Sequence, residues 1–230
     1  HYDENIWLAS GGGGIGGFWG HVRSNGVDTS NGSKSTGSIP FMHVVDSQML
    51  AFNQGITRRG SYAAYMAISH PEIEEFISMR KTTGGDLNRK CLNLHNAVNI
   101  TNEFLDAVKK DEPWRLIDPK SNAAIKTISA RDLWWQLIST RAETGEPYII
   151  NIDTCNDKLP EEQKNLGLSI HQSNLCSEIT LPTNEERTAV CCLSSVNLEH
   201  FDEWSTDDYF IPDLITMLDN VLESFIGSTA

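Results

Sequence analysis

Stretches typical of β-strands alternate with stretches typical of α-helices along most of this 230-residue chain, and this alternation constrains the fold more than any other feature. Strands are expected over four short apolar stretches, at residues 63–66, 94–100, 114–117 and 148–152. Helices are expected over residues 39–53, 71–80 and 212–226, after Thr101, and between Ser129 and Gly145. The alternation predicts an α/β fold with a largely parallel sheet, and a barrel is compatible with it.

The composition describes an ordinary globular protein, 39% hydrophobic and 21% charged. The sequence shows no apolar run of membrane-spanning length and no secretory leader, so we expect no membrane partner. A net charge of −13 argues against binding a nucleic acid backbone, which needs surplus Lys and Arg. The odd number of cysteines, without framework spacing, favours a reducing cytoplasmic location; they are Cys91, Cys155, Cys176, Cys191 and Cys192.

The first sixty residues are rich in glycine and small polar residues, which favours turns and loops. The glycine-rich stretch 10–17 is a weak dinucleotide-binding candidate, and we expect a tight turn or close chain packing there. In the segment 53–61, Arg58 and Arg59 stand between glycines in an otherwise acidic chain. Adjacent arginines can bind phosphate or stack on a base, and a solvated surface turn is the alternative. Arg23 and His21, just before a long polar loop, are further basic residues in this part of the chain.

The strongest candidate for a reactive site is the set of alternate residues Asn174, Cys176 and Glu178. In an extended segment these three side chains would project to the same side, because side chains alternate along a strand. Together they would supply a neutral hydrogen-bonding group, a reactive sulfur and a potential general base, which is the composition of a reaction centre. The alternative is a strand with one ordinary buried cysteine.

A second cysteine segment follows fifteen residues after Cys176, at the vicinal pair Cys191 and Cys192. If Cys191 came near Cys176, the chain would have one thiol for reaction and another for redox work, with Glu178 as a base. A zinc site is a weak option, because there is no Cys-x-x-Cys and His171 is a lone histidine near Cys176.

These motifs resemble the large, catalytic subunit of ribonucleotide reductase of the class I and class II kind. Ser-Asn-Leu-Cys-x-Glu-Ile is that family's active-site signature, and it stands here at residues 173–179. Ala-Val-Cys-x-Leu matches at 189–193. Four further stretches agree in order, at residues 13–16, 39–41, 54–61 and 144–149.

The resemblance implies catalytic roles residue by residue. Cys176 looks like the cysteine that becomes a thiyl radical and abstracts the 3′ hydrogen of the ribonucleotide. Glu178 looks like the base for the 3′ hydroxyl, and Asn174 like the amide that hydrogen-bonds the sugar hydroxyls. Cys191 is similar to one member of the reducing cysteine pair, whereas Cys192 lies one position beyond the motif and receives no such role.

The resemblance also implies binding residues and an architecture. Gly14, Ser173 and Arg58 would join Asn174 in binding substrate, and Arg23, Gln54 and Arg58 would contact a deoxynucleoside triphosphate or ATP effector. The implied fold is part of a ten-stranded α/β barrel, with Cys176 on a central finger loop. We expect residues 1–230 to form one domain, with the effector and specificity loops in 1–62 and barrel elements in 63–230.

The implied partners are those of a reductase that supplies deoxyribonucleotides for DNA replication. They are the remaining pieces of the large subunit, a second copy as a homodimer, a radical-generating small subunit, and thioredoxin or glutaredoxin. We expect this chain to bind no cofactor and no metal itself. The radical would come from the metal-containing small subunit, or from adenosylcobalamin in a class II enzyme.

The family's large subunit is much longer than this chain. The other reducing cysteine, a phosphate-binding segment, a radical-passing tyrosine pair and mobile C-terminal cysteines are not in the 230 residues. We therefore expect a split or fragmentary reductase that is inactive alone. The alternatives are a non-catalytic module that binds nucleotide effectors and a thiol-redox protein that exchanges disulfides with thioredoxin-like partners.

Overall fold

The computed structural model describes the backbone of residues 1–54 and 58–229 and the side chains of residues 1–52 and 59–228. The chain divides into two compact units, His1–Thr183 and Asn184–Ala230. The single domain expected over residues 1–230 stays a prediction.

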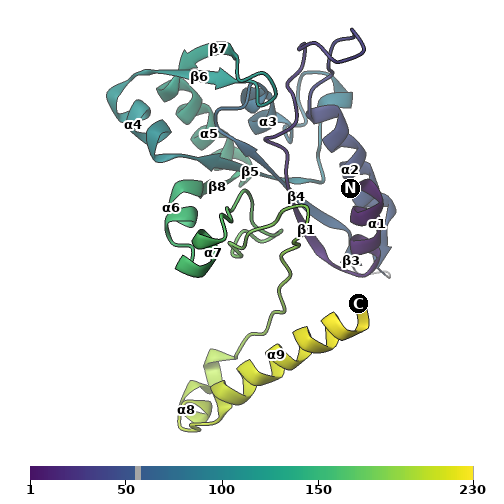
Figure 1. Ribbon diagram of the computed structural model, residues 1–230, viewed down its shortest axis with the longest axis vertical. Helices are drawn as coiled ribbons and strands as arrows, with labels where there is room; N and C mark the ends of the chain where they lie inside the picture. The colour runs from purple at the N-terminus through teal and green to yellow at the C-terminus, as the bar shows by residue number, and fades with distance from the viewer. Residues whose placement is uncertain (55–57, 230) are drawn as a thin grey trace. The chain divides into compact units, whose positions relative to one another are not determined.

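Four parallel strands form the central sheet of the first unit, in the order β1-β4-β5-β8 (Figure 1). These strands are β1 (Gly14–Phe18), β4 (Ser61–Ala67), β5 (His95–Ile100) and β8 (Tyr148–Asn151). The main helices between successive strands are α2 (Ile39–Ala51), α3 (Ile73–Ser78), α4 (Asn102–Lys110) and α5 (Ala130–Thr144). Parallel neighbours joined by helical crossovers confirm the predicted α/β fold.

The two faces of the sheet are covered by different parts of the first unit. One face packs against helices α2 to α5 and forms the larger core, which includes Met42, Val45, Tyr62, Met66, Phe76, Val98, Phe104 and Leu137. The other face carries mostly small or aromatic side chains, together with one isoleucine, and packs against Leu175 and Cys155; its strand residues are Phe18, Ala63, Tyr65, Ala97, Tyr148 and Ile150. The second face therefore receives the segment that contains the reactive signature.

Smaller elements complete the two units. In the first unit these are α1 (Tyr2–Ser10), the antiparallel pair β2 (Asn53–Gln54) and β3 (Arg58–Arg59), η1 (Leu87–Arg89), the hairpin β6 (Pro113–Ile117) and β7 (Ala124–Ser129), α6 (Ile152–Asp157) and α7 (Glu161–Asn165). The second unit contains η2 (Leu198–His200), α8 (Phe201–Trp204) and α9 (Phe210–Thr229). Within residues 1–54 and 58–229, no helix combines the length and the apolar character needed to cross a bilayer.

Local capping explains why several helices begin and end where the sequence predicts. The Thr101 hydroxyl accepts a hydrogen bond from the Phe104 N–H at 3.1 Å, at the start of α4. The Ser129 hydroxyl accepts one from Asp132 N–H at 3.1 Å, at the start of α5. Helix α5 ends at Gly145, whose φ of 81° is left-handed and suits glycine.

The glycine-rich stretch forms the expected turn at residues 11–12 and then continues as strand β1. A Cβ atom on Gly16 would overlap the Ser173 carbonyl oxygen, and one on Gly17 would overlap the Tyr62 hydroxyl. The two glycines project to opposite faces of the sheet, because side-chain directions alternate along a strand. Their absent side chains let neighbouring groups approach β1 from both sides, which is the close packing that the sequence offered as the other reading.

Candidate functional site

The segment 171–175 lies along β1 on the second face of the sheet, the one that helices α2 to α5 do not cover. It runs in the direction opposite to β1. The ring of His171 stacks on Phe18, Ser173 lies against Gly16, and Leu175 lies against Gly14. Two side chains from the sheet hold its backbone, because Asn99 Nδ2 donates to the His171 carbonyl and the Tyr65 hydroxyl donates to the Asn174 carbonyl, each at 2.6 Å. The sheet thus fixes the residues that lead into the reactive signature.

Residues 175–177 form a turn, so the extended row predicted for Asn174, Cys176 and Glu178 is wrong in its backbone geometry. Ser177 has a left-handed φ of 75°, and its N–H donates to the Asn174 carbonyl at 3.4 Å. The Asn174 side chain closes the loop, because its Oδ1 accepts from Ile179 N–H at 3.3 Å. A polar side chain that bonds to nearby backbone competes with strand pairing and favours such a turn.

The turn nevertheless brings together two of the three predicted side chains. Asn174 Nδ2 donates to Glu178 Oε1 at 2.9 Å, and Cys176, which stands between them in the sequence, is exposed on the turn. Ser173, predicted to bind substrate, is buried below and donates to the Ile179 carbonyl at 2.6 Å. The site therefore presents an accessible thiol on the same turn as an amide and a carboxylate that already contact each other.

Two tyrosines border this turn. Burial raises the pKa of Tyr65, and hydrogen bonds with Ser177 and Ser173 act in the opposite direction. Burial also raises the pKa of Tyr148, with smaller contributions from negative charge on Glu146 and on Cys176. Both phenols therefore stay protonated at neutral pH and can act as hydrogen-bond donors.

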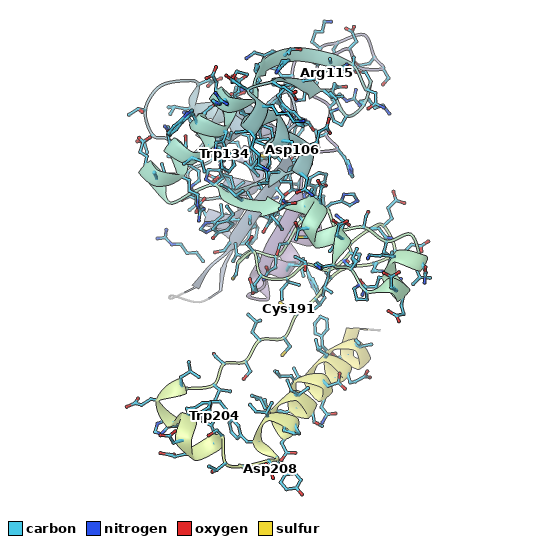
Figure 2. All side chains as sticks on the ribbon, turned by 90° about the vertical axis from the view of Figure 1, so that its left-hand side faces the viewer. Asp106, Arg115, Trp134, Cys191, Trp204 and Asp208 are labelled. Atoms are coloured by element: carbon cyan, nitrogen blue, oxygen red, sulfur yellow. The ribbon has the colours of Figure 1, made fainter. Side chains whose placement is uncertain are left out.

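The remaining cysteines differ in setting from Cys176. Cys91 is fully buried in the helix-covered core, and burial raises its pKa to about 12. Burial also raises the pKa of Cys155 on α6. Cys191 is exposed on the irregular stretch that precedes α8 in the second unit, and Cys192 is half-buried (Figure 2). The expected approach of Cys191 to Cys176 stays a prediction.

The candidate effector residues lie in the first unit. Arg23 is half-buried where the polar loop leaves β1. Its neighbour Ser24 donates to Asp118 Oδ1 from the backbone at 2.8 Å and from the hydroxyl at 2.9 Å. Burial would raise the pKa of Asp118, but hydrogen bonds from Ser24 and Ser121 outweigh it and lower the pKa to about 2. An ionised Asp118 therefore anchors the start of this loop.

The other predicted contacts lie on the short hairpin. Gln54 pairs with Arg58 through the backbone of β2 and β3, while their side chains and residues 55–57 lie outside the described part of the chain. Arg59 lines a cavity of about 170 Å³ whose wall also includes Arg80. Gly14, predicted to line the substrate site, begins β1 and is exposed beside Leu175.

Sequence reasoning missed several side chains that support the turn, notably Tyr65, Asn99 and Tyr148. Each stands in a strand that reads as buried, and its polar group is the signal that could have identified it. A buried hydroxyl or amide needs a partner, and here Tyr65 and Asn99 use the 171–175 segment.

Metal ligands are not gathered at this site. Within the described residues, no group of three or more His, Cys, Asp and Glu side chains lies close enough to hold a metal ion. His21 and His171 approach each other with ring centroids 5.2 Å apart, and burial lowers the pKa of His171.

Comparison with known proteins gives consistent results. The model of the family "Ribonucleotide reductase, barrel domain" matches residues 1–228. A provisionally named ribonucleoside-diphosphate reductase large subunit of Frog virus 3 (isolate Goorha) is 54% identical over 226 residues, which cover 98% of this chain and 39% of that protein. The ribonucleoside-diphosphate reductase large subunit of Invertebrate iridescent virus 3 is 44% identical over 84% of this chain and 39% of its own length.

A solved structure shows the same fold. The class Id ribonucleotide reductase alpha subunit of Actinobacillus ureae superposes with a TM-score of 0.79 at 31% identity, over 98% of this chain and 38% of that chain. The chain thus spans about two fifths of the length of these relatives. The fold, the signature at 173–179 and these matches together show that the chain belongs to the ribonucleotide reductase barrel-domain family and is part of its α/β barrel.

Proposed function

We propose that this chain carries the reaction centre of a ribonucleoside-diphosphate reductase, which acts when the rest of a large subunit completes it. The observation that carries the proposal is the 2.9 Å hydrogen bond from Asn174 to Glu178 across the turn on which Cys176 is exposed. A thiol, an amide and a carboxylate held on one rigid turn can engage the adjacent hydroxyls and the hydrogens of one ribose.

In the proposed reaction, a thiyl radical on Cys176 takes the hydrogen atom from C3′ of the ribose. Glu178 accepts the proton of the 3′ hydroxyl, while Asn174 hydrogen-bonds the sugar hydroxyls. The 2′ hydroxyl leaves as water. A dithiol formed by Cys191 and a cysteine outside this chain supplies two electrons and two protons and becomes a disulfide. One of these protons leaves in the water and the other becomes the new hydrogen on C2′, while Glu178 returns its proton to the 3′ oxygen. Cys176 finally returns the hydrogen atom to C3′, which regenerates its radical.

The names of the relatives support a substrate class, and the family resemblance suggests the partners. Those relatives are named ribonucleoside-diphosphate reductases, so we propose a ribonucleoside diphosphate as substrate. Gly14, Ser173 and Arg58 would border it, and Arg23, Gln54 and Arg58 would contact a nucleoside triphosphate effector. A radical-generating small subunit, a thioredoxin or glutaredoxin, and a second copy of the large subunit complete the proposed assembly.

Complementation tests this proposal. The 230-residue chain is assayed alone and after mixing with the missing large-subunit segments and the small subunit of a close relative, with deoxynucleotide formation as the readout. We expect product from the mixture only, because the relatives are more than twice as long as this chain. Effector binding without any product in the mixture would favour the non-catalytic module instead, and product from the lone chain would contradict the account of a fragment.

A further inference from the structure

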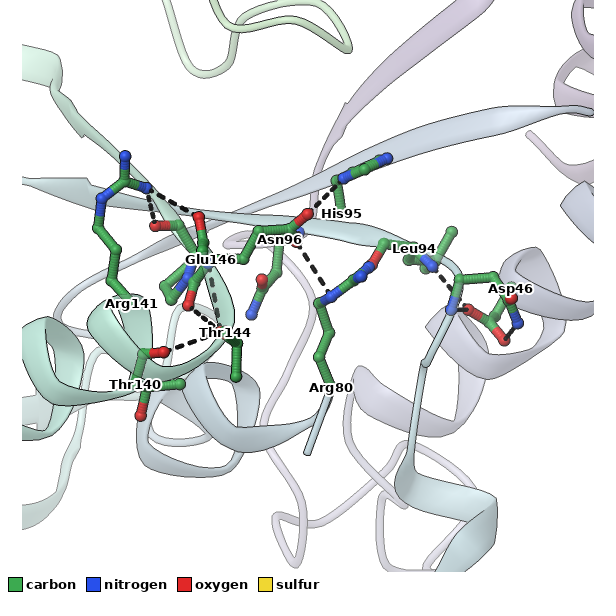
Figure 3. Close-up of polar contacts among 12 residues, drawn as sticks. Asp46, Arg80, Leu94, His95, Asn96, Thr140, Arg141, Thr144 and Glu146 are labelled. Carbon is green, nitrogen blue, oxygen red and sulfur yellow. Dashed lines mark hydrogen bonds and ion pairs between the residues drawn. The ribbon is translucent and has the colours of Figure 1, made fainter. Parts of the chain in front are cut away.

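Glu146 is a largely buried carboxylate at the edge of the sheet, between the end of α5 and the start of β8. Its side chain is 12% exposed, and its Oε2 lies 3.1 Å from Arg80 Nε and 3.2 Å from the Asn96 backbone N–H (Figure 3). Its Oε1 contacts Nδ1 of His95, the first residue of β5. One carboxylate therefore joins the end of α3 to the first residues of β5.

The backbone that carries Glu146 is itself fixed (Figure 3). The Thr144 hydroxyl donates to the Glu146 carbonyl at 2.7 Å and accepts from the Glu146 N–H at 3.2 Å. Arg141 donates to the Pro147 carbonyl at 2.7 Å. Arg80 is held a second time, because its guanidinium also donates to the Leu94 carbonyl. The carboxylate thus has little freedom to leave His95.

His95 links this network to the second face of the sheet, the reactive face, which carries the turn with Cys176. Its imidazole stacks on the ring of Tyr148, with the centroids 6.1 Å apart and the planes within 4° of parallel. Tyr148 and Leu175, the residue before Cys176, pack against the same small cluster of buried residues on this face of the sheet. The contacts therefore run from Glu146 through His95 and Tyr148 to the neighbourhood of Cys176.

The contact with Glu146 also determines which imidazole nitrogen of His95 carries the proton. A carboxylate accepts hydrogen bonds only, so Nδ1 of His95 carries the proton and Nε2 carries a lone pair in the neutral ring. No hydrogen bond to Nε2 is made within the described residues, and the His95 side chain is one third exposed. An acceptor with a fixed orientation is thus available on the face that bears Cys176.

We propose that Glu146 is a positioning residue of the reactive face, and that the His95–Tyr148 pair it orients forms a wall of the nucleotide site, where His95 Nε2 accepts a hydrogen bond from the nucleotide. This inference rests on the proposed function, because it takes the nucleotide to lie beside Cys176. In a purely structural role, Glu146 would only hold the end of α3 against β5 through Arg80 and Asn96. The two readings differ in whether Glu146 acts through His95.

A double-mutant cycle in the complemented enzyme separates them. Glu146→Ala and His95→Ala should each raise the KM for the nucleotide about tenfold, with a smaller change in kcat, because each removes one oriented hydrogen bond. The double variant should be no worse than either single variant, since both remove the same contact. Glu146→Gln retains an acceptor for Nδ1–H and should stay within about threefold of the parent.

Glu143→Gln is the matched control, because Glu143 also lies near the end of α5 but pairs with Lys81 at the surface. It should leave KM unchanged. KM effects of Glu146→Ala and His95→Ala that multiply in the double variant would overturn the positioning role. So would a Glu146→Ala variant that loses thermal stability but keeps the parental KM.

A second measurement needs no turnover. Nitrogen-15 NMR of the histidine rings in the 230-residue chain should show His95 protonated at Nδ1, and Glu146→Ala should shift the proton toward Nε2. A parent His95 protonated at Nε2 would overturn the inference even if the complemented enzyme is active. The opposite outcome is the expected NMR result together with no deoxynucleotide from the complemented parent. The proposed function would then have failed, and the proposed contact of His95 with the nucleotide would fail with it. The orientation of His95 by Glu146 would still stand.

Discussion

Asn174 donates a 2.9 Å hydrogen bond to Glu178 across the turn that exposes Cys176. The Asn174 side chain also accepts from Ile179 N–H, and the Asn174 backbone carbonyl accepts from the Tyr65 hydroxyl. One residue thus shapes the turn, orients the proposed base and ties both to the sheet.

Replacing Asn174 with alanine should therefore loosen the turn. We expect Asn174→Ala to cost about 1–2 kcal/mol in the free energy of unfolding of the first unit, because it leaves the Ile179 N–H and Glu178 without their partner. Urea denaturation measures this change. Asn165→Ala, at an exposed position on α7, is the control and should change the unfolding free energy by less than about 0.5 kcal/mol.

Gly16 tests the packing of the signature segment on β1. Gly16→Ala should cost about 1–3 kcal/mol, because the added methyl group would overlap the Ser173 carbonyl oxygen and backbone must move. In Gly11→Ala the new Cβ meets only ordinary contacts, at 3.5 and 3.6 Å. Equal stability of the two variants in chemical denaturation would mean that segment 171–175 does not lie against β1.

Cysteine alkylation should follow burial. At pH 8 a thiol with a pKa of about 12 is ionised in only about one molecule in ten thousand, so Cys91 should react far more slowly than the exposed Cys176. Cys155, whose pKa is also raised by burial, should fall between them. Mass spectrometry of peptides from briefly alkylated native protein measures the order, and a Cys91 that reacts as fast as Cys176 would contradict the buried core around it.

Asp118 should make stability depend on pH in the acid range. Its folded pKa of about 2 lies below the ordinary value of 3.8, so its stabilising effect is full above about pH 4 and is lost as the pH falls toward 2. Asp118→Asn should be less stable at neutral pH and should flatten the fall in stability between pH 4 and 2.

Urea midpoints across that range test the effect of Asp118. Asp106→Asn, which removes an exposed carboxylate paired with Lys109, is the control and should keep the parental slope. An Asp118→Asn variant with the parental slope would show that Ser24 and Ser121 do not stabilise the ionised carboxylate.

Local signals made much of the fold predictable. The Thr101 and Ser129 caps and the Gly145 terminus each depend on a few neighbouring residues, and helices α4 and α5 begin or end there as expected. The glycine stretch contains the expected turn at residues 11–12, but strand β1 after it was not predicted, because the reason for Gly16 and Gly17 is the approach of Ser173 and Tyr62, which lie far away in sequence.

The candidate site could be proposed from composition, but its geometry could not be predicted. Asn174, Cys176 and Glu178 stand out by composition, yet the turn depends on the Asn174 side chain bonding to its own backbone neighbourhood. Glu146 and His95 carry no local signal, because their contact spans 51 positions and forms only when β5 and β8 pair.

Turnover by Cys176→Ala in the complemented enzyme tests the central claim most directly. We predict that Cys176→Ala abolishes deoxynucleotide formation and keeps effector binding, whereas Cys155→Ala, which removes a half-buried thiol on α6, keeps both. Deoxynucleotide formation by Cys176→Ala at a rate near that of the parent would contradict the assignment of Cys176 as the reacting thiol.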